Sequence, residues 1–180
     1  MSVRRLKGVP IVVLTGTENA GKTTLAQGIA SALNWEVLPE AARTDSRVIG
    51  GTVDRAHLQQ MLLQFNDQLT GLMSTAPRGI VCDTGGLVLE MWSRHAFEAG
   101  LEGTEDTMDR AHLHLLCHTL PDWEPDPLRT MPRHADRLKL QTQYRTQLIA
   151  LNAVFCELGT ANLDDRLAEA IRCIHQHCAP

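Results

Sequence analysis

The amino-acid sequence predicts an α/β fold built around a parallel sheet. Short apolar or β-branched segments alternate with longer segments of helical periodicity, and this alternation is typical of parallel strands joined by helices. The expected strands are residues 11–14, 37–38, 80–82, 113–117 and 154–158. The expected helices are residues 22–33, 54–73, 87–99, 135–151 and 163–177. A chain of 180 residues can bury one good core, so we expect a single domain over residues 1–180.

Local signals support several of these elements. The helix at residues 54–73 carries an apolar stripe at intervals of three and four, which should face the sheet: Leu58, Met61, Leu62, Phe65, Leu69 and Leu72. Gly79 follows Pro77 and Arg78 in a turn that ends this helix before the third strand. Asp164 and Asp165 open the last helix, where carboxylates can cap free amides. The polar, glycine-bearing residues 44–52 predict a mobile loop.

The overall charge argues against two classes of partner. Charged residues make up 21% of the chain and the formal net charge is -4, so no global positive field attracts nucleic acid or an anionic membrane surface. The first residues are basic, but the apolar run at 11–14 is far too short for a signal peptide or a membrane span. We therefore expect a cytoplasmic protein without nucleic-acid or membrane partners, and the oligomeric state stays open.

The cysteines predict reduced thiols. They are odd in number, form no C-x-x-C pair and are best explained as buried thiols: Cys82, Cys117, Cys156, Cys173 and Cys178. The tail "CIHQHC" also contains His175 and His177, but it lacks the spaced second pair of a structural zinc site. A solvated helix end is the favoured interpretation of this tail.

The stretch "GTENAGKTT" has the G-x4-G-K-[ST] spacing of a phosphate-binding P-loop, and it lies between an apolar strand and an Ala/Leu-rich helix. Glycines let the backbone amides approach phosphate oxygens, and the helix start adds free N–H groups. Lys22 can bridge the β- and γ-phosphates of a nucleoside triphosphate, and the Thr23 hydroxyl can reach Mg²⁺; the loop does not choose ATP over GTP. We expect the nucleotide to be held by Gly16, Thr17, Glu18, Asn19, Ala20, Gly21, Lys22, Thr23 and Thr24.

Two carboxylates are candidates for catalysis beside this loop. Asp83 ends the apolar strand of "GIVCDTGG", the usual place for a carboxylate that holds Mg²⁺ in P-loop proteins, although the same residues also suit a turn. Glu40 in "LPEAAR" follows the second strand at the ligand-binding edge of the sheet, where it could accept a proton from an acceptor hydroxyl. Glu40 and Arg43 could instead form an ordinary i, i+3 pair.

An irregular, proline-rich segment at residues 121–137 predicts a lid. Arg129, Arg133 and Arg137 are spaced by four, although Pro132 makes a continuous helix doubtful. Arginines of a mobile flap can neutralise charge on a transferring phosphoryl group, so Arg129 is a catalytic candidate and Arg133 a nucleotide-binding one. A solvated basic face is the alternative. Backbone of the later loop "ELGTANLDDR" could contact the nucleotide base.

Taken together, these segments resemble the AAA_28 group of P-loop ATP-binding proteins, which includes the nicotinamide riboside kinase domain of NadR-type proteins. The resemblance covers nearly the whole chain through "GTENAGKTT", "PEAAR", "CDT", "WEPDPLR" and a closing "DDR" helix. It implies a three-layer P-loop NTPase fold of nucleoside- or nucleotide-kinase type, with five parallel strands in the order 2-3-1-4-5 and an arginine-bearing lid. It also implies substrate contacts from Glu40, Arg43, Trp123 and Asp126, and Mg²⁺ contacts from Thr23 and Asp83.

The chain departs from that group at the acceptor side. Pro39 and Ala41 stand where such nicotinamide riboside kinases tend to carry aromatic residues, and Gly85 stands where they have a second aspartate. The sequence therefore predicts a Mg²⁺-dependent kinase that moves the γ-phosphate of ATP to a hydroxyl of a small nucleoside-like metabolite, with nicotinamide riboside as one candidate. The alternative function is a P-loop NTPase or nucleotide-dependent switch that acts with a protein partner.

Overall fold

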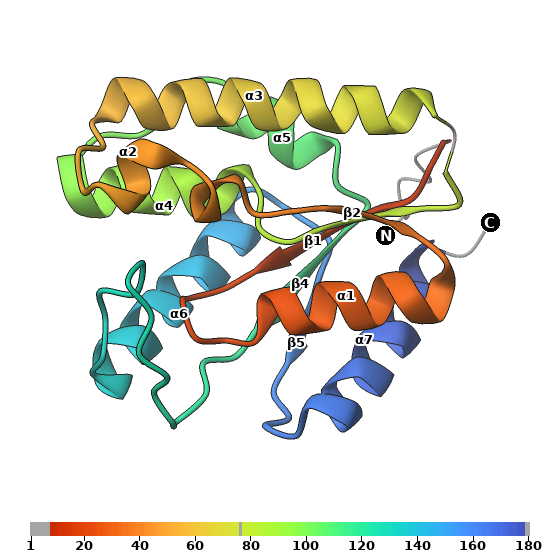
Figure 1. The fold of residues 1–180 in the computed structure, drawn as a ribbon. Coiled ribbons are helices and arrows are strands. Elements are labelled where there is room, and N and C mark those ends of the chain that lie inside the picture. Colours follow the sequence, from red (N-terminus) through yellow and green to blue (C-terminus); the bar gives the residue numbers. More distant parts are fainter. Residues whose placement is uncertain (1–7, 76, 179–180) are drawn as a thin grey trace.

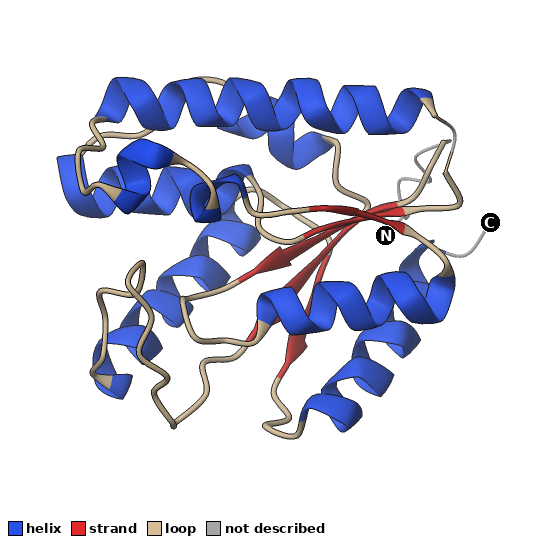
Figure 2. Ribbon diagram, in the orientation of Figure 1, coloured by secondary structure: helices blue, strands red, loops and turns tan. Residues whose placement is uncertain are grey.

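A computed structural model, which describes residues 8–75 and 77–178, contains a five-stranded parallel sheet. The strands are β1 (Ile11–Thr15), β2 (Glu36–Leu38), β3 (Ile80–Cys82), β4 (Leu113–Cys117) and β5 (Phe155–Leu158). Their order in the sheet is β2-β3-β1-β4-β5, which confirms the expected order (Figures 1 and 2). Val12 of the central strand β1 lies in register with Val81 of β3 and Leu113 of β4.

Helices cover both faces of the sheet and complete the three layers (Figure 1). Their bounds are α1 (Lys22–Leu33), α2 (Ser46–Ile49), α3 (Arg55–Ser74), α4 (Gly86–Phe97), α5 (Thr104–Asp109), α6 (His134–Ala150) and α7 (Leu163–Cys178), with a 3₁₀ turn η1 (Ala41–Arg43). Helices α1 and α7 pack on one face. Helices α3, α4 and α6 contribute to the clusters on the other face. This arrangement buries the three central strands, β3, β1 and β4, on both sides, as their largely apolar sequences require.

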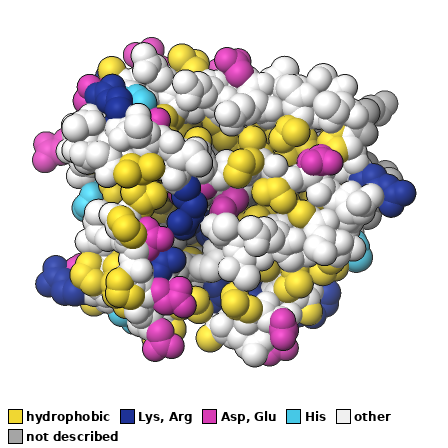
Figure 3. All heavy atoms as spheres, in the orientation of Figure 1, with side chains coloured by type: hydrophobic (Ala, Val, Ile, Leu, Met, Phe, Trp, Pro, Cys, Tyr) yellow, Lys and Arg dark blue, Asp and Glu magenta, His cyan; other side chains and the backbone are white. Residues whose placement is uncertain are grey.

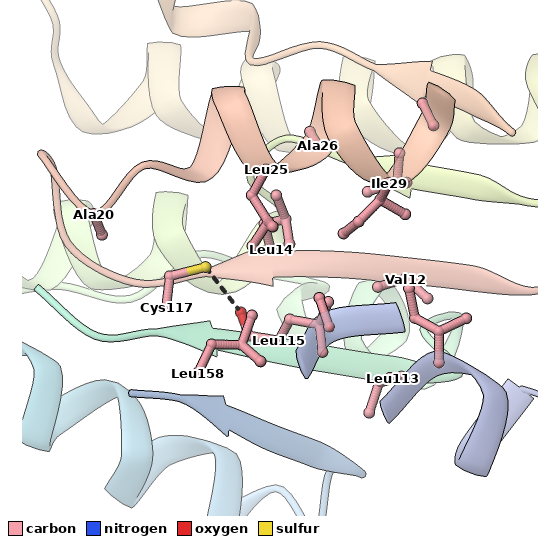
Figure 4. Packing of buried hydrophobic residues seen from close by; sticks show 14 residues of the cluster. Val12, Leu14, Ala20, Leu25, Ala26, Ile29, Leu113, Leu115, Cys117 and Leu158 are labelled. Atoms are coloured by element: carbon pink, nitrogen blue, oxygen red, sulfur yellow. Dashed lines mark hydrogen bonds between the residues drawn. The ribbon is translucent and has the colours of Figure 1, made fainter. Parts of the chain in front are cut away.

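The largest core cluster lies between the sheet and the α1–α7 pair (Figure 4). Val12, Leu14 and Leu115 of the strands pack there with Leu25 and Ile29 of α1, and all five side chains are at most 2% exposed. This packing fixes the carboxyl end of β1 and the start of α1, the two elements that frame the predicted phosphate loop. The predicted phosphate loop is therefore anchored on both sides by elements of the largest core cluster.

The cysteines are free thiols in this structure. Cys82 and Cys117 are buried in the sheet, and burial raises the pKa of Cys82 to about 12 and that of Cys117 to about 11. The other three cysteines are partly buried. Thiols with such high pKa values stay protonated near neutral pH and act as small apolar core groups.

Three local expectations need correction. Residues 44–52, predicted as a loop, contain the short helix α2, because the Asp45 side chain accepts from the amides of Arg47 and Val48. Helix α5 was not expected. Helix α7 is capped by Asn162, whose Oδ1 accepts from the amides of Asp164 and Asp165 at 2.9 and 3.0 Å, so the two aspartates donate to the cap.

Two further expectations concern the chain ends and membranes. The basic N-terminal residues 1–7 lie outside the described residues. No helix in the described ranges 8–75 and 77–178 is long and apolar enough to cross a membrane.

Candidate active site

The predicted site residues meet at a cavity of about 970 Å³ at the carboxyl edge of the sheet. Its lining comes from the β1–α1 loop and the start of α1, the segments after β2 and β3, the irregular segment between β4 and α6, helices α2, α3, α4 and α6, and the segment that leads into α7. Parallel α/β sheets bind ligands at this edge. Figure 3 shows the corresponding face, where basic and acidic side chains lie beside hydrophobic ones.

The loop between β1 and α1 has a backbone that only particular residues can adopt. Gly16 has φ +142°, and a Cβ atom there would lie 2.6 Å from the carbonyl oxygen of Cys117. Gly21 has φ +72° and is the N-cap of α1. Asn19 between them also has a positive φ, 56°. Gly16 is thus required by geometry and Gly21 is strongly favoured, and this loop conformation places the free amides of α1 at the cavity.

Lys22 and the two threonines after it form the first turn of α1 and line the cavity. Lys22 Nζ donates to the carbonyl oxygens of Gly16 at 3.1 Å and Thr17 at 2.7 Å, so the ammonium group curls over its own loop. Of the other loop residues, Gly16, Glu18, Asn19 and Gly21 line the cavity. The lining does not include Thr17 or Ala20, whose side chains are buried.

Asp83 lies directly after β3 and is only 3% exposed, yet it lines the cavity. Its amide donates to Leu38, whereas Oδ1 is buried with no hydrogen-bond partner among the described residues. A buried carboxylate oxygen without a partner is costly unless a cation or donor satisfies it. Asp83 and the Thr23 hydroxyl are both oxygen ligands that suit Mg²⁺, so the residues present fit this ion.

Glu40, Arg43 and Asp126, which were predicted to contact the substrate, form one charged group. Arg43 Nε lies 3.2 Å from Glu40 Oε2, and Arg43 Nη1 lies 3.3 Å from Asp126 Oδ2. The backbone amide of Leu128, and after it Arg43, lower the pKa of Asp126 below its usual value. The ion pair between Arg43 and Asp126 thus joins the segment after β2 to the lid. Glu40 forms the i, i+3 pair with Arg43 and also lines the cavity.

The lid is bound directly to the phosphate loop. Glu18 accepts hydrogen bonds from the backbone amides of Thr130 and Met131, the former at 2.8 Å. Arg129 Nη1 donates to Asn19 Oδ1 at 2.9 Å and also to the Glu124 carbonyl oxygen. Figure 1 shows this irregular segment beside the loop between β1 and α1. Glu18 and Asn19, which lie between the two glycines of the loop, therefore hold the lid beside the cavity.

Three further residues of the lid, Arg133, Arg137 and Trp123, do not line the cavity. Arg133 is the N-cap residue of α6, pairs with Asp136 at 2.6 Å and has an 82% exposed side chain. Arg137, expected on a solvated or phosphate-facing surface, is fully buried. It donates to Thr119 Oγ1 and to carbonyl oxygens of Leu120, Met131 and Pro132. Trp123 lies under the Arg137 guanidinium, 5.0 Å from ring centroid to Cζ, and is not part of the lining.

Sequence reasoning missed two groups of residues. Arg166 is 1% exposed and donates to the carbonyl oxygens of Thr160, Ala20 and His118, which ties the loop before α7 to the phosphate loop. Aromatic side chains from three helices also line the cavity: Phe65, Trp92, Phe97 and Tyr144. Burial raises the pKa of the Tyr144 phenol, so it stays neutral. Both groups are assembled by distant parts of the chain. Arg166 stands in the "DDR" segment, but that segment alone does not indicate its partners, and the four aromatic residues form no local motif.

A family profile described as an AAA domain, AAA_28, matches residues 11–166, which include the phosphate loop, the acceptor-side segment, the lid and Arg166. The chain belongs to the AAA_28 family. This confirms the resemblance seen in the sequence. No curated protein matches the chain.

Solved structures with the same fold include a NadR protein and two kinases. A NadR protein in complex with NR superposes on this AAA_28 domain with a TM-score of 0.72 at 20% identity, covering 96% of this chain and 51% of that one. A deoxyadenosine kinase from M. mycoides gives a TM-score of 0.68 at 12% identity, covering 92% and 99%. The shikimate kinase of Acinetobacter baumannii gives 0.59 at 14% identity, covering 99% and 100%. The AAA_28 domain thus spans about half the length of the NadR protein.

Proposed function

We propose that this AAA_28 domain is a kinase that transfers the γ-phosphate of ATP to a hydroxyl of a small nucleoside-like metabolite. One observation carries the proposal: a single cavity joins the phosphate loop to the Glu40–Arg43–Asp126 group beneath a lid. A switch that only binds and hydrolyses nucleotide does not need a second charged group facing the phosphates. A kinase needs it to hold an acceptor in line with the γ-phosphate.

The residues have separate roles in this proposal. The loop amides and Lys22 hold the β- and γ-phosphates of ATP, and Lys22 exchanges its loop carbonyls for phosphate oxygens. Thr23 and Asp83 would hold Mg²⁺, which when bound offsets the negative charge of the phosphates. Glu40 accepts the proton of the acceptor hydroxyl. The hydroxyl oxygen then forms the new bond to the γ-phosphorus, and the bond between the γ-phosphorus and the ADP oxygen breaks.

Arg129 is placed to act when the lid closes fully on nucleotide. In this structure it binds Asn19 of the phosphate loop and lines the cavity, so a short movement brings its guanidinium to phosphate oxygens. Planar guanidinium groups bind phosphates through paired hydrogen bonds. Such a contact contributes most as charge builds up during transfer.

The test is acceptor-dependent turnover. Purified protein is incubated with ATP, Mg²⁺ and a panel of nucleosides, which includes nicotinamide riboside because a NadR protein was solved with NR. ADP release is followed with and without each compound. A kinase gives ADP release that requires an acceptor, whereas release at the same rate without any acceptor contradicts the proposal and indicates an NTPase.

A further inference from the structure

The acceptor end of the cavity has an apolar wall made of Val48, Val53, Leu58, Met61, Leu89 and Trp92. These side chains belong to α3, α4 and the segment from α2 to α3, and they pack into one cluster. Leu58 and Met61 are buried at 5% and 2% exposure, while the other four are partly buried. The wall is therefore a packed surface with a fixed shape, and part of it faces the cavity.

The wall has few side chains that could form hydrogen bonds with a polar ring of a ligand. Between residues 48 and 97, the hydrogen-bonding side chains in the described lining are Asp83, Thr84 and the indole of Trp92. Asp83 and Thr84 directly follow β3, beside the central strand, rather than lying on the helical wall. A site that recognises a base or an amide normally has side chains that pair with its donors and acceptors, because unpaired polar groups of the ligand lose their water contacts.

The basic side chains of the described lining already have partners. Lys22 is bonded to its loop, Arg43 to two carboxylates and Arg129 to Asn19 and Glu124. The acceptor end also contains the carboxylates of Glu40 and Asp126. An acceptor carrying a phosphate or carboxylate would meet like charges there, and burying it against the apolar wall would cost still more.

At the mouth of the cavity, two large apolar side chains are exposed. Ile49 at the end of α2 is 59% exposed, and Phe97 at the end of α4 is 36% exposed. Both line the cavity, so a bound molecule that reaches from Glu40 along the wall would cover them. Their exposure extends the apolar surface from the wall to solvent.

We infer that the acceptor is an alcohol without an anionic group, and that its non-reacting part is an apolar ring or chain rather than a base with a hydrogen-bonding edge. The inference rests on the proposed kinase function and narrows its substrate class. The hydroxyl lies at Glu40 and Arg43, and the apolar part lies on the wall between α3 and α4.

Binding and turnover are measured separately so that this inference and the kinase proposal fail in different ways. The probes are a phenyl C-riboside, nicotinamide riboside and a carboxyphenyl C-riboside, which share the ribose hydroxyls and differ in the ring. Calorimetry is done on protein loaded with Mg²⁺ and a non-hydrolysable ATP analogue. The phenyl compound is expected to bind at least about tenfold more tightly than either of the other two.

Two variants locate the binding surface. Leu89→Gln puts an amide into the wall and is expected to weaken phenyl C-riboside binding about tenfold while the affinity for the ATP analogue is unchanged. Leu63→Gln is the matched control, because Leu63 is 56% exposed on α3 and outside the lining. Circular dichroism verifies that both variants are folded.

The outcomes are distinct. If the phenyl compound binds as expected but releases no ADP, the acceptor-site inference stands and the kinase proposal fails for this class. If nicotinamide riboside or the carboxylated compound binds as tightly as the phenyl compound, or if none binds, the inference is overturned. An equal loss of affinity in Leu63→Gln and Leu89→Gln also overturns it.

Discussion

Lys22 donates from Nζ to two carbonyl oxygens of its own loop, and the same side chain lines the cavity. Because the ammonium group bonds to carbonyl oxygens of the loop and does not pack in the apolar core, Lys22→Ala should remove phosphate contacts and leave the fold intact. We expect turnover to fall by about a hundredfold, the equivalent of about 3 kcal/mol in the transition state. Lys139→Ala, at a 78% exposed lysine of α6, is the control. Wild-type kinetics and nucleotide affinity in folded Lys22→Ala would remove the phosphate loop from the account.

Glu40 and Asp83 carry carboxylates with different surroundings, and this difference predicts different mutant behaviour. Glu40 is paired with Arg43 at the acceptor end, so Glu40→Gln should lower the acceptor-dependent rate by about a hundredfold or more and change ATP affinity little. Asp83 has a buried oxygen without a described partner, so Asp83→Asn should instead raise the Mg²⁺ concentration needed for half-maximal turnover. Steady-state kinetics against Mg²⁺ and acceptor separate the two. The reverse pattern would move the proton-accepting role to Asp83.

At the scale of elements, the lid depends on Glu18 of the phosphate loop. Glu18→Gln weakens the acceptor for the amides of Thr130 and Met131, because a charged oxygen binds N–H groups more strongly than a neutral amide oxygen does. We expect these two amides to exchange hydrogen faster in Glu18→Gln, by about tenfold for a loss of about 1.4 kcal/mol. Hydrogen exchange measured by mass spectrometry over residues 121–137 checks this.

The control for the lid is Glu36→Gln, at an exposed position at the start of β2. It should leave exchange in the lid unchanged. If Glu18→Gln also leaves it unchanged, Glu18 does not hold the lid and the hydrogen bonds seen here are incidental.

The strands and long helices could be predicted because their signals are local. Strands buried on both faces, such as β1 and β4, have continuous apolar sequences, and α3 has a regular stripe. Helices α2 and α5 could not be predicted in the same way. They have only four and six residues. The Asp45 side chain caps α2, whereas α5 has no side-chain cap and is held by the burial of Thr104, Thr107 and Met108.

At the scale of the whole molecule, the buried His114 in β4 makes stability depend on pH. Burial lowers the pKa of His114 from 6.5 to about 4, and its Nε2 has no described partner. Between these two pH values the unfolded chain binds a proton that the folded protein does not bind. The free energy of unfolding therefore falls as pH drops from 6.5 to about 4, by about 1.4 kcal/mol per unit and roughly 3 kcal/mol in all.

Urea unfolding at about pH 7 and about pH 4.5 measures this loss, with His114→Gln as the variant that cannot titrate. The variant should lose clearly less stability than the wild type over that range. His118→Gln is the control, because His118 is partly exposed and paired with Glu157. An equal loss in wild type and His114→Gln would show that other groups cause the pH dependence.

Those parts of the candidate site that stand next to the end of a strand in the sequence could be predicted. The phosphate loop, Asp83 after β3 and Glu40 after β2 are each next to a strand end, so local sequence placed them at one edge of the sheet. The contacts of Arg166 and the position of the apolar wall at the cavity could not be predicted, because the partners lie far away in sequence, as Ala20 does from Arg166. Arg137 was misplaced for the same reason: its partners surround it only after the lid folds back on α6.

The central claim is that the γ-phosphate moves to an organic hydroxyl and not to water. The most direct measurement uses ATP labelled in its γ-phosphate, with Mg²⁺, the protein and each acceptor probe, and separates labelled organic phosphate from labelled inorganic phosphate. The account predicts that the label appears in the acceptor and that Lys22→Ala abolishes most of this transfer. Label found only in inorganic phosphate, at a rate that no acceptor changes, would contradict it.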